Sequence, residues 1–370
     1  MIHIVAYAIA TIIPLVVLYF IFTRDVYGTG ETRLVIISFV WGAIAFAIAS
    51  GINNYVGPFL GFIVTTRFFA PVIEELLKGS ILVNLVRRPD FTYFVDGAIY
   101  GFAVGMGFAV FENYQYILNE PIAALDVAVG RVISTNLMHA SASAVTGIAF
   151  GLSRFERTIG KVRIIVIGLA IAILLHMGFN NLVTRVSSGW LLLYAAAVGI
   201  TSLLVIWAAI RRGLEDEKLW IAETLGAADR VTEGEAAVVQ HMSDLEQLLD
   251  PLAKRFGGEK ASQIEHFLTL QARLGIMRKT LEKLPDASMR SAVEDEMDEL
   301  RAEMDVTRRA VGTFAMMYLR SIFPDEDESL WGHFEDVITQ RAALNPSPEG
   351  GGLWGNLEKR QSQDSDEESV

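Results

Sequence analysis

Seven ionisable side chains inside the long apolar runs of this sequence have types and spacing that could do chemistry, in a setting where charged groups are rare. They are Glu74, Glu75, Lys78, Asp96, Glu112, His139 and His176. An ionisable group at the centre of a bilayer costs about 2.5–3.5 kcal/mol to insert, so such residues usually have a function. Carboxylates and imidazoles can accept a proton from water, stabilise an oxyanion or bind a metal ion. The set therefore indicates a hydrolytic site, a metal site or a proton pathway.

Helical spacing suggests different roles within this set. Glu74 and Lys78 are four residues apart, in the favourable order for an ion pair, so we expect them to pair. The adjacent Glu75 then points about 100° away, because a helix has about 3.6 residues per turn. His176 and Asn180 share one helix face at the same four-residue spacing. We therefore predict that Glu75 is a general base, with Glu74 supporting it and Lys78 anchoring Glu74.

The distance of each residue from the end of its apolar run predicts its depth. At about 1.5 Å per residue, Glu75 lies about 17 Å from the basic end of its run, and His139 and His176 lie about 20 Å from theirs. Glu112 lies about 28 Å from the corresponding end. Four helices would thus meet between the bilayer centre and the outer surface. Asp96 lies near the inner end and fits the group less well.

Seven apolar segments are long enough to place these residues on membrane-spanning helices. They cover residues 3–23, 34–52, 58–86, 93–118, 125–151, 162–184 and 189–210. The third contains Arg67 and could begin as an interfacial or re-entrant piece. In the fourth, the glycines at 101, 105 and 107 would let a neighbouring helix approach closely. The first segment lacks a basic leader and a clear cleavage site, so we predict a retained helix.

Basic residues alternate along the connections between these segments. One side receives nearly all of them: Arg24, Arg33, Arg87, Arg88, Arg154, Arg157, Lys161, Arg163, Arg211 and Arg212. Basic residues concentrate on the cytoplasmic side of membrane proteins. The pattern predicts an outside N-terminus and a cytoplasmic C-terminal part.

Composition divides the 370-residue chain after Arg212. The later part holds 33 acidic and 17 basic residues, a net charge of −16, whereas the earlier part carries +4. We predict a transmembrane domain over 1–212, a soluble helical cytoplasmic domain over 213–344 and a disordered acidic tail over 345–370. The acidity argues against nucleic acid or anionic lipid as partners of the C-terminal part. Its helices could serve a homo-oligomer or a regulatory partner.

The predicted fold is an all-α polytopic bundle, and its polar residues allow several functions. With Glu75 as base, a histidine or Asn180 could hold the oxyanion. Alternatively, Glu112, His139 and His176 could bind Zn²⁺, although no H-E-x-x-H spacing is present. The chain has no cysteine, which excludes thiol catalysis and cysteine-ligated metals. The same polar residues would also suit a proton-coupled transporter, and a non-enzymatic membrane scaffold would not need them for chemistry.

Four motifs on separate apolar runs resemble the PrsW family of intramembrane proteases, distant relatives of CAAX prenyl and bacteriocin-processing proteases. They are E-E-x-x-K at Glu74–Lys78, F-x-x-x-E at Phe108–Glu112 with Asn113 following, His139, and "HMGFN" at His176–Asn180. The family often has Asp where this chain has Asn180. The resemblance covers about residues 60–185. It implies a multi-pass protein of the bacterial inner membrane that cleaves single-span membrane substrates such as anti-sigma factors, with Asn113 in a supporting role.

Overall fold

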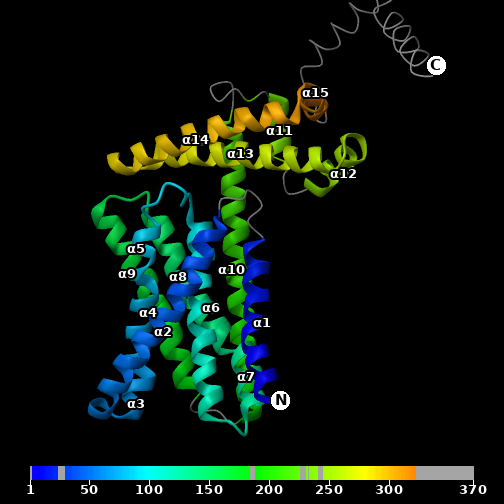
Figure 1. The fold of residues 1–370 in the computed structure, drawn as a ribbon. Coiled ribbons are helices and arrows are strands. Elements are labelled where there is room, and N and C mark those ends of the chain that lie inside the picture. Colours follow the sequence, from blue (N-terminus) through cyan, green and yellow to red (C-terminus); the bar gives the residue numbers. More distant parts are fainter. Residues whose placement is uncertain are drawn as a thin grey trace, which may run out of the picture.

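The computed structural model describes residues 2–23, 30–183, 188–225, 231, 233–240 and 245–321. All of its regular structure within these ranges is helical, which confirms the predicted all-α class. Upright helices form a bundle, and a layer of further helices lies across one end of it (Figure 1). The N-terminal end of α1 lies at the opposite end of the bundle from this layer.

Four described helices have the length and apolar composition needed to cross a bilayer. They are α1 (Ile2–Phe22), α2 (Thr32–Leu60), α6 (Phe94–Asn119) and α9 (Thr158–Val183). Each corresponds to one of the seven predicted segments. Length and composition therefore establish a helical membrane protein with four candidate spans, and the other three segments are built differently.

The predicted span at 58–86 begins with a chain reversal and continues as consecutive helical segments whose junction residues keep helical backbone angles. Helix α2 continues to Leu60, and Gly61 then adopts a φ of 81°, a left-handed conformation that favours glycine. The chain continues through α3 (Phe62–Val64), the π-helical turn η1 (Thr65–Phe69), α4 (Ala70–Ser80) and α5 (Leu82–Leu85). Such π turns often occur at functional sites. Here η1 immediately precedes the helix that carries the two adjacent glutamates.

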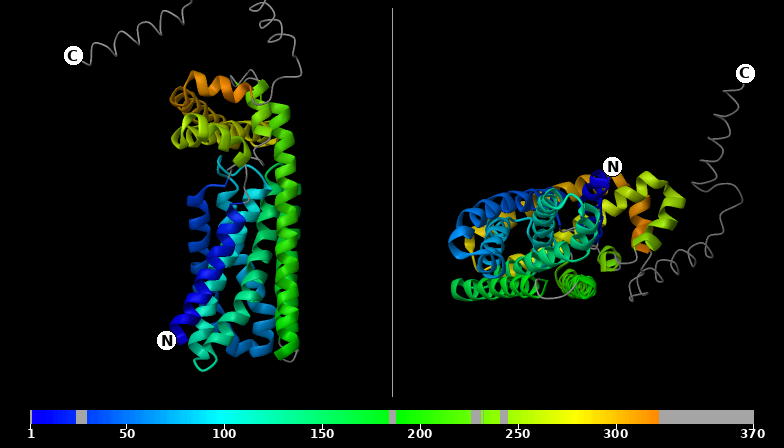
Figure 2. Two further views of the ribbon diagram at one scale, coloured as in Figure 1. Left: turned by 90° about the vertical axis from the view of Figure 1, so that its right-hand side faces the viewer. Right: turned by 90° about the horizontal axis from the view of Figure 1, so that it is seen from below.

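The fifth and seventh predicted spans also differ from single membrane-length helices. Residues 125–151 form α7 (Ala124–Ile133) and α8 (Thr135–Ser153), which are separated at Ser134. The final span is the first part of α10 (Ser188–Thr224), which passes through the predicted boundary at Arg212 without a break. This helix runs along the bundle and into the layer (Figure 2). The bundle and the layer are thus joined by a continuous helix.

The layer consists of α11 (Glu233–Gln240), α12 (Leu245–Phe256), α13 (Gly258–Lys283), α14 (Ala287–Val311) and α15 (Thr313–Ser321). It packs onto the bundle: Arg273 pairs with Glu31 at 2.9 Å, and Thr280 Oγ1 donates to the carbonyl oxygen of Thr92 at 3.4 Å. Both parts contribute to one buried apolar cluster. The predicted tail at 345–370 lies outside the described residues.

Helix α6 is the centre of the bundle, and nearly all of its membrane-length window is buried. Its glycines face neighbouring backbones, as predicted: Gly101 and Gly105 meet α8, and Gly107 meets α2. Asp96 accepts hydrogen bonds from Thr92 N at 2.6 Å and Thr92 Oγ1 at 2.8 Å, so it caps the start of α6. The close packing sets how near α6 brings its carboxylate to the histidine of α8.

Candidate active site

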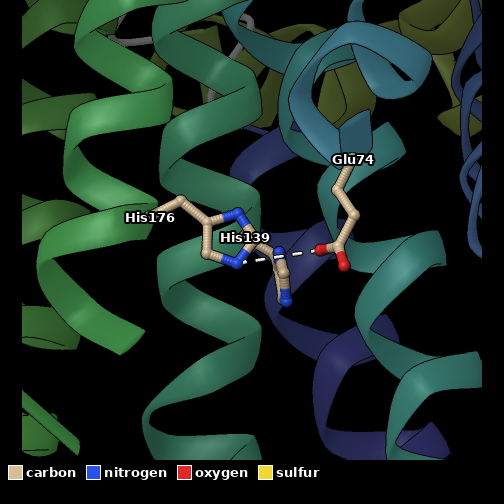
Figure 3. A group of neighbouring side chains, drawn as sticks. All are labelled: Glu74, His139 and His176. Atoms are coloured by element: carbon tan, nitrogen blue, oxygen red, sulfur yellow. Dashed lines mark ion pairs between the residues drawn. The ribbon is translucent and has the colours of Figure 1, made fainter. Parts of the chain in front are cut away.

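Four helices bring the predicted residues together inside the bundle. Helix α4 carries Glu74, Glu75 and Lys78, α6 carries Glu112, α8 carries His139 and α9 carries His176. Figure 3 shows Glu74, His139 and His176 converging from three of these helices. All of the six except Glu112 are buried. The predicted convergence of residues far apart in the sequence is thus present in the structure.

Glu75 lies at the centre of a polar network. Its Oε1 accepts a hydrogen bond from Lys78 Nζ at 2.6 Å and lies 2.8 Å from His176 Nδ1. Its Oε2 is buried and has no hydrogen-bond partner among the described residues. One oxygen of this carboxylate is therefore held in place, and the other is available to a small molecule in the site.

The predicted pairing of Lys78 with Glu74 is wrong, because Lys78 contacts Glu75. Both glutamates are within reach of this lysine, since residues three and four apart are neighbours on a helix surface. Glu74 instead turns toward α2, where Asn53 Nδ2 donates to its Oε1 at 3.2 Å. The contacts made by the surrounding helices decide which carboxylate the lysine meets.

Glu74 joins the two imidazoles in the group best arranged to hold a metal ion. Its Oε2 lies 3.7 Å from His176 Nε2. The candidate ligand atoms of Glu74, His139 and His176 all lie within 4.8 Å of one another, and all three residues are buried. In the described part of the chain, the carboxylate of this group is thus Glu74, where the sequence-based set had Glu112.

Glu112 approaches the same cluster from another side. Its Oε2 lies 3.0 Å from His139 Nε2 and accepts a hydrogen bond from Arg131 Nη2 at 2.5 Å. The same arginine donates through Nε to Asn113 Oδ1 at 2.8 Å, and Asn113 Nδ2 donates to Asn136 Oδ1 at 2.6 Å. This chain of contacts holds Glu112 against one ring nitrogen of His139.

The contacts assign a role to each ring nitrogen of the two histidines. His139 directs Nε2 to Glu112, and His176 directs Nδ1 to Glu75, so each imidazole donates one N–H to a carboxylate. The lone pairs then remain on His139 Nδ1 and His176 Nε2. Histidines that bind metals usually donate their other N–H to a carboxylate in this way.

The donor set fits a metal of the zinc type. One carboxylate and two imidazoles are ligands that Zn²⁺ uses in hydrolases, where three protein ligands leave a further position open. Lys78 Nζ lies 3.0 Å from His139 Nδ1 and donates a hydrogen bond to the lone pair of this nitrogen. A bound metal ion would replace Lys78 at this nitrogen, while Lys78 could retain its contact with Glu75.

Asn180 lies on the same helix as His176 and contacts the π turn. Its Nδ2 donates to the carbonyl oxygen of Thr66 in η1 at 2.9 Å. This contact ties α9 to the segment that leads into α4, and so to the two glutamates. The role of Asn180 as an oxyanion donor stays a prediction.

Three residues of the network are absent from the sequence-based set: Asn53, Arg131 and Asn136. Asn53 directly follows the second predicted segment, whereas Arg131 and Asn136 lie inside the fifth. The structure places Arg131 on α7, where its guanidinium pairs with Glu112. A sequence signal exists only for Asn136, which precedes His139 by three residues and is therefore on the same helix face.

Carboxylates and imidazoles from four helices meet in one site of this helical membrane protein, an arrangement that suits an intramembrane hydrolase. The family model for the "PrsW family intramembrane metalloprotease" matches residues 30–210. The membrane part of the chain is thus similar to the PrsW family of intramembrane metalloproteases over residues 30–210, just under half of its length. Helices α11–α15 lie beyond the matched residues.

The chain is also similar to proteins named Protease PrsW from several bacteria. It is 28% identical to that of Bacillus subtilis over 117 residues, 31% of this chain and 52% of the relative. With that of Shouchella clausii it shares 28% identity over 220 residues, 55% of this chain and 95% of the relative. With that of Clostridioides difficile it shares 27% identity over 206 residues, which are 53% of this chain and 84% of the relative. The match thus spans about half of the Bacillus subtilis relative. No solved structure matches the chain significantly.

Proposed function

We propose that this protein hydrolyses a peptide bond of a membrane-anchored protein, with Glu75 as the general base. The observation that carries the proposal is the buried, unpartnered Oε2 of Glu75 beside the cluster of Glu74, His139 and His176. A general base must lie within hydrogen-bond reach of the proton that it removes. A water molecule between this oxygen and the cluster would meet that condition.

The contacts of Glu75 suit it to accept and return a proton. Lys78 and His176 hold Oε1, which orients Oε2. Oε2 takes a proton from water while the water oxygen adds to the peptide carbonyl carbon. When the C–N bond breaks, Glu75 gives this proton to the nitrogen of the leaving amine. The two steps together consume one water molecule and one peptide bond, yield a carboxylic acid and an amine, and return Glu75 to its starting state.

Glu74, His139 and His176 would hold the metal that the family description implies. A bound divalent metal supplies Lewis acidity, which stabilises negative charge on oxygen during hydrolysis. Glu112 and Glu75 would orient the two imidazoles by accepting their N–H groups. Arg131 would hold Glu112, and Asn53 would hold Glu74. In this proposal Glu112 is a positioning residue.

We further propose that all seven apolar segments cross the bilayer, with the N-terminus outside and the layer of α11–α15 in the cytoplasm. The arrangement in Figure 1 supports this, because the layer lies at the end of the bundle where α2, α6 and α9 begin. The basic connections of the sequence are at this same end. Glu112 and His176 lie in the later halves of α6 and α9, which favours a site toward the outer side.

The substrate class follows from where the site lies. A site enclosed by apolar helices is reached most readily by a chain already anchored in the bilayer, so we propose single-span membrane proteins, such as anti-sigma factors, as substrates. The layer of α11–α15 would be a regulatory or oligomerisation module on the cytoplasmic side. The domain limits at 212 and 344 belong to the same proposal.

Two conservative variants separate the proposed base from the proposed metal ligand. Purified wild type, Glu75→Gln and Glu74→Gln are compared for cleavage of a library of single-span substrates and for bound zinc. We expect Glu75→Gln to retain zinc and lose cleavage by about 100-fold or more, the usual effect of removing a general base. Glu74→Gln should lose both. The exposed Glu120→Gln is the control and should behave as wild type.

Cleavage by Glu75→Gln at the wild-type rate would refute the assignment of the base. Full zinc content in Glu74→Gln would refute the ligand assignment without affecting that of the base. A reporter fused after Arg212 tests the orientation separately, and a reading on the outer side would overturn it.

A further inference from the structure

A cavity lies where the bundle meets the layer, outside the proposed active site. It measures about 110 Å³ and is bordered by α5, α8, α9 and the start of α14. Its lining is partly basic and partly apolar, and includes Arg87, Arg154, Lys161, Val83, Ile165 and Met289. None of these residues belongs to the proposed active site.

Arg154 is the unusual residue of this cavity, because its guanidinium is buried but only partly satisfied. The residue is 1% exposed, and its Nη1 donates to the carbonyl oxygens of Val86 and Arg88. Its Nε and Nη2 have no hydrogen-bond partner in the described structure. Leaving buried charged donors unpaired is costly, so these two nitrogens point to a ligand that the protein itself does not supply.

The acidic residues nearby are engaged elsewhere. The negative charges that act on Arg154 are those of Asp96 and Asp90. Asp96 caps α6, and Asp90 forms an ion pair with Arg88 at 2.8 Å. Neither forms a hydrogen bond to Nε or Nη2 of Arg154. The cavity therefore retains positive charge from Arg154, Arg87 and Lys161.

The chemistry of this cavity fits a phosphate group. Two adjacent guanidinium nitrogens form a planar fork that matches two oxygens of a phosphate, and a lysine adds a point charge. Val83 and Ile165 also line the cavity, and Val83 is 39% exposed on the outer surface of the bundle. On α9, Val162 follows the cavity-lining Lys161 in the sequence and is 57% exposed. These exposed apolar side chains lie where lipid acyl chains would contact the protein.

We propose that this cavity binds the phosphate of an anionic phospholipid. Basic pockets between membrane helices on the cytoplasmic side are typical sites for such headgroups. Free phosphate has the same oxygens, but the lateral apolar surface favours a molecule with acyl chains. Met289 of α14 borders the cavity, so the bound lipid would contact both the bundle and the layer. The proposal does not depend on the protease activity.

Native mass spectrometry of the full-length protein in detergent tests the proposal. The protein is titrated with phosphatidylglycerol or with phosphatidylcholine, and the affinity of the first bound lipid is compared. The variant Arg87→Gln/Lys161→Gln keeps the buried Arg154 and removes two charges from the rim. The control Arg157→Gln/Arg163→Gln removes two exposed charges that do not line the cavity.

We expect wild type and control to prefer phosphatidylglycerol, and the rim variant to bind it about 30-fold more weakly. Equal affinity for the two lipids, or equal losses in the rim variant and the control, would overturn the proposal. It would also be overturned if millimolar inorganic phosphate binds in the absence of lipid and abolishes the preference, because the ligand would then be free phosphate. Arg154→Gln is an additional variant, and it is interpreted only if its thermal unfolding matches that of wild type.

Discussion

Replacing Gly105 by alanine would test whether close packing of α6 against α8 positions His139. Gly105 faces the backbone of α8, and a Cβ placed there would lie 2.5 Å from Ala140 Cα and would overlap the carbonyl oxygen of His139. Ordinary van der Waals contact of a Cβ begins at 3.4 Å. Helix α8 would therefore have to move by about 0.9 Å at this point. The opposing atoms are backbone, so a side-chain rotation cannot relieve the overlap.

The displacement would affect the site through the two nitrogens of His139. Nδ1 lies 3.0 Å from Lys78 Nζ and Nε2 lies 3.0 Å from Glu112 Oε2, so a shift of almost 1 Å disrupts both contacts. A misplacement of about 1 Å in a catalytic site can cost about 100-fold in rate. Overpacking by one methyl group destabilises a protein by about 1–3 kcal/mol. We expect a folded variant with about 100-fold lower cleavage and a lower Tm.

Gly178→Ala provides a matched control. Gly178 lies on α9, two residues after His176, and a Cβ at this position meets nothing within 4 Å. This variant should keep its cleavage rate within about twofold, because it neither moves a helix nor fills the site. Both variants are assayed on the same single-span substrate, with rates normalised to folded protein and with bound zinc measured. Wild-type cleavage and Tm in Gly105→Ala would refute the packing argument.

Three further predictions concern the residues that support the site. Asn53→Ala should lower zinc affinity about 10- to 100-fold, because Glu74 loses the amide that orients it. The control Asn54→Ala changes an exposed neighbour and should leave zinc affinity unchanged. Equal zinc affinity in both variants would contradict this prediction. Arg131→Lys should lower the cleavage rate despite its retained charge, because lysine cannot replace the fork that contacts Glu112 and Asn113; full activity would show that charge alone suffices. Treatment with a chelator should abolish cleavage and added Zn²⁺ should restore it, so chelator-resistant activity would exclude a role for the metal.

The sequence alone predicted much of the fold, because the signals involved are local. Apolar runs of membrane length and their basic flanks depend only on composition, and four of the predicted segments appear as single helices of that length. The connection before the third segment was predicted at residues 53–57 and lies instead at Gly61, and the break at Ser134 was missed, because the hydrophobic runs continue across both positions. The seventh segment was predicted to end at residue 210, but α10 continues to Thr224. A helix can pass from lipid to water while its sequence changes from apolar to charged, so the change in composition did not mark the end of the helix.

The sequence by itself determined which residue types are buried in the membrane, and their cost in an apolar environment marked them as functional. Only the tertiary structure decided how they pair. Glu74 and Glu75 are adjacent, and both are within helical reach of Lys78. His176 from α9 draws Glu75 toward the lysine, and Asn53 from α2 draws Glu74 away from it. Because these partners lie on other helices, spacing along α4 could not reveal which carboxylate joins the histidines and which retains an unpaired oxygen.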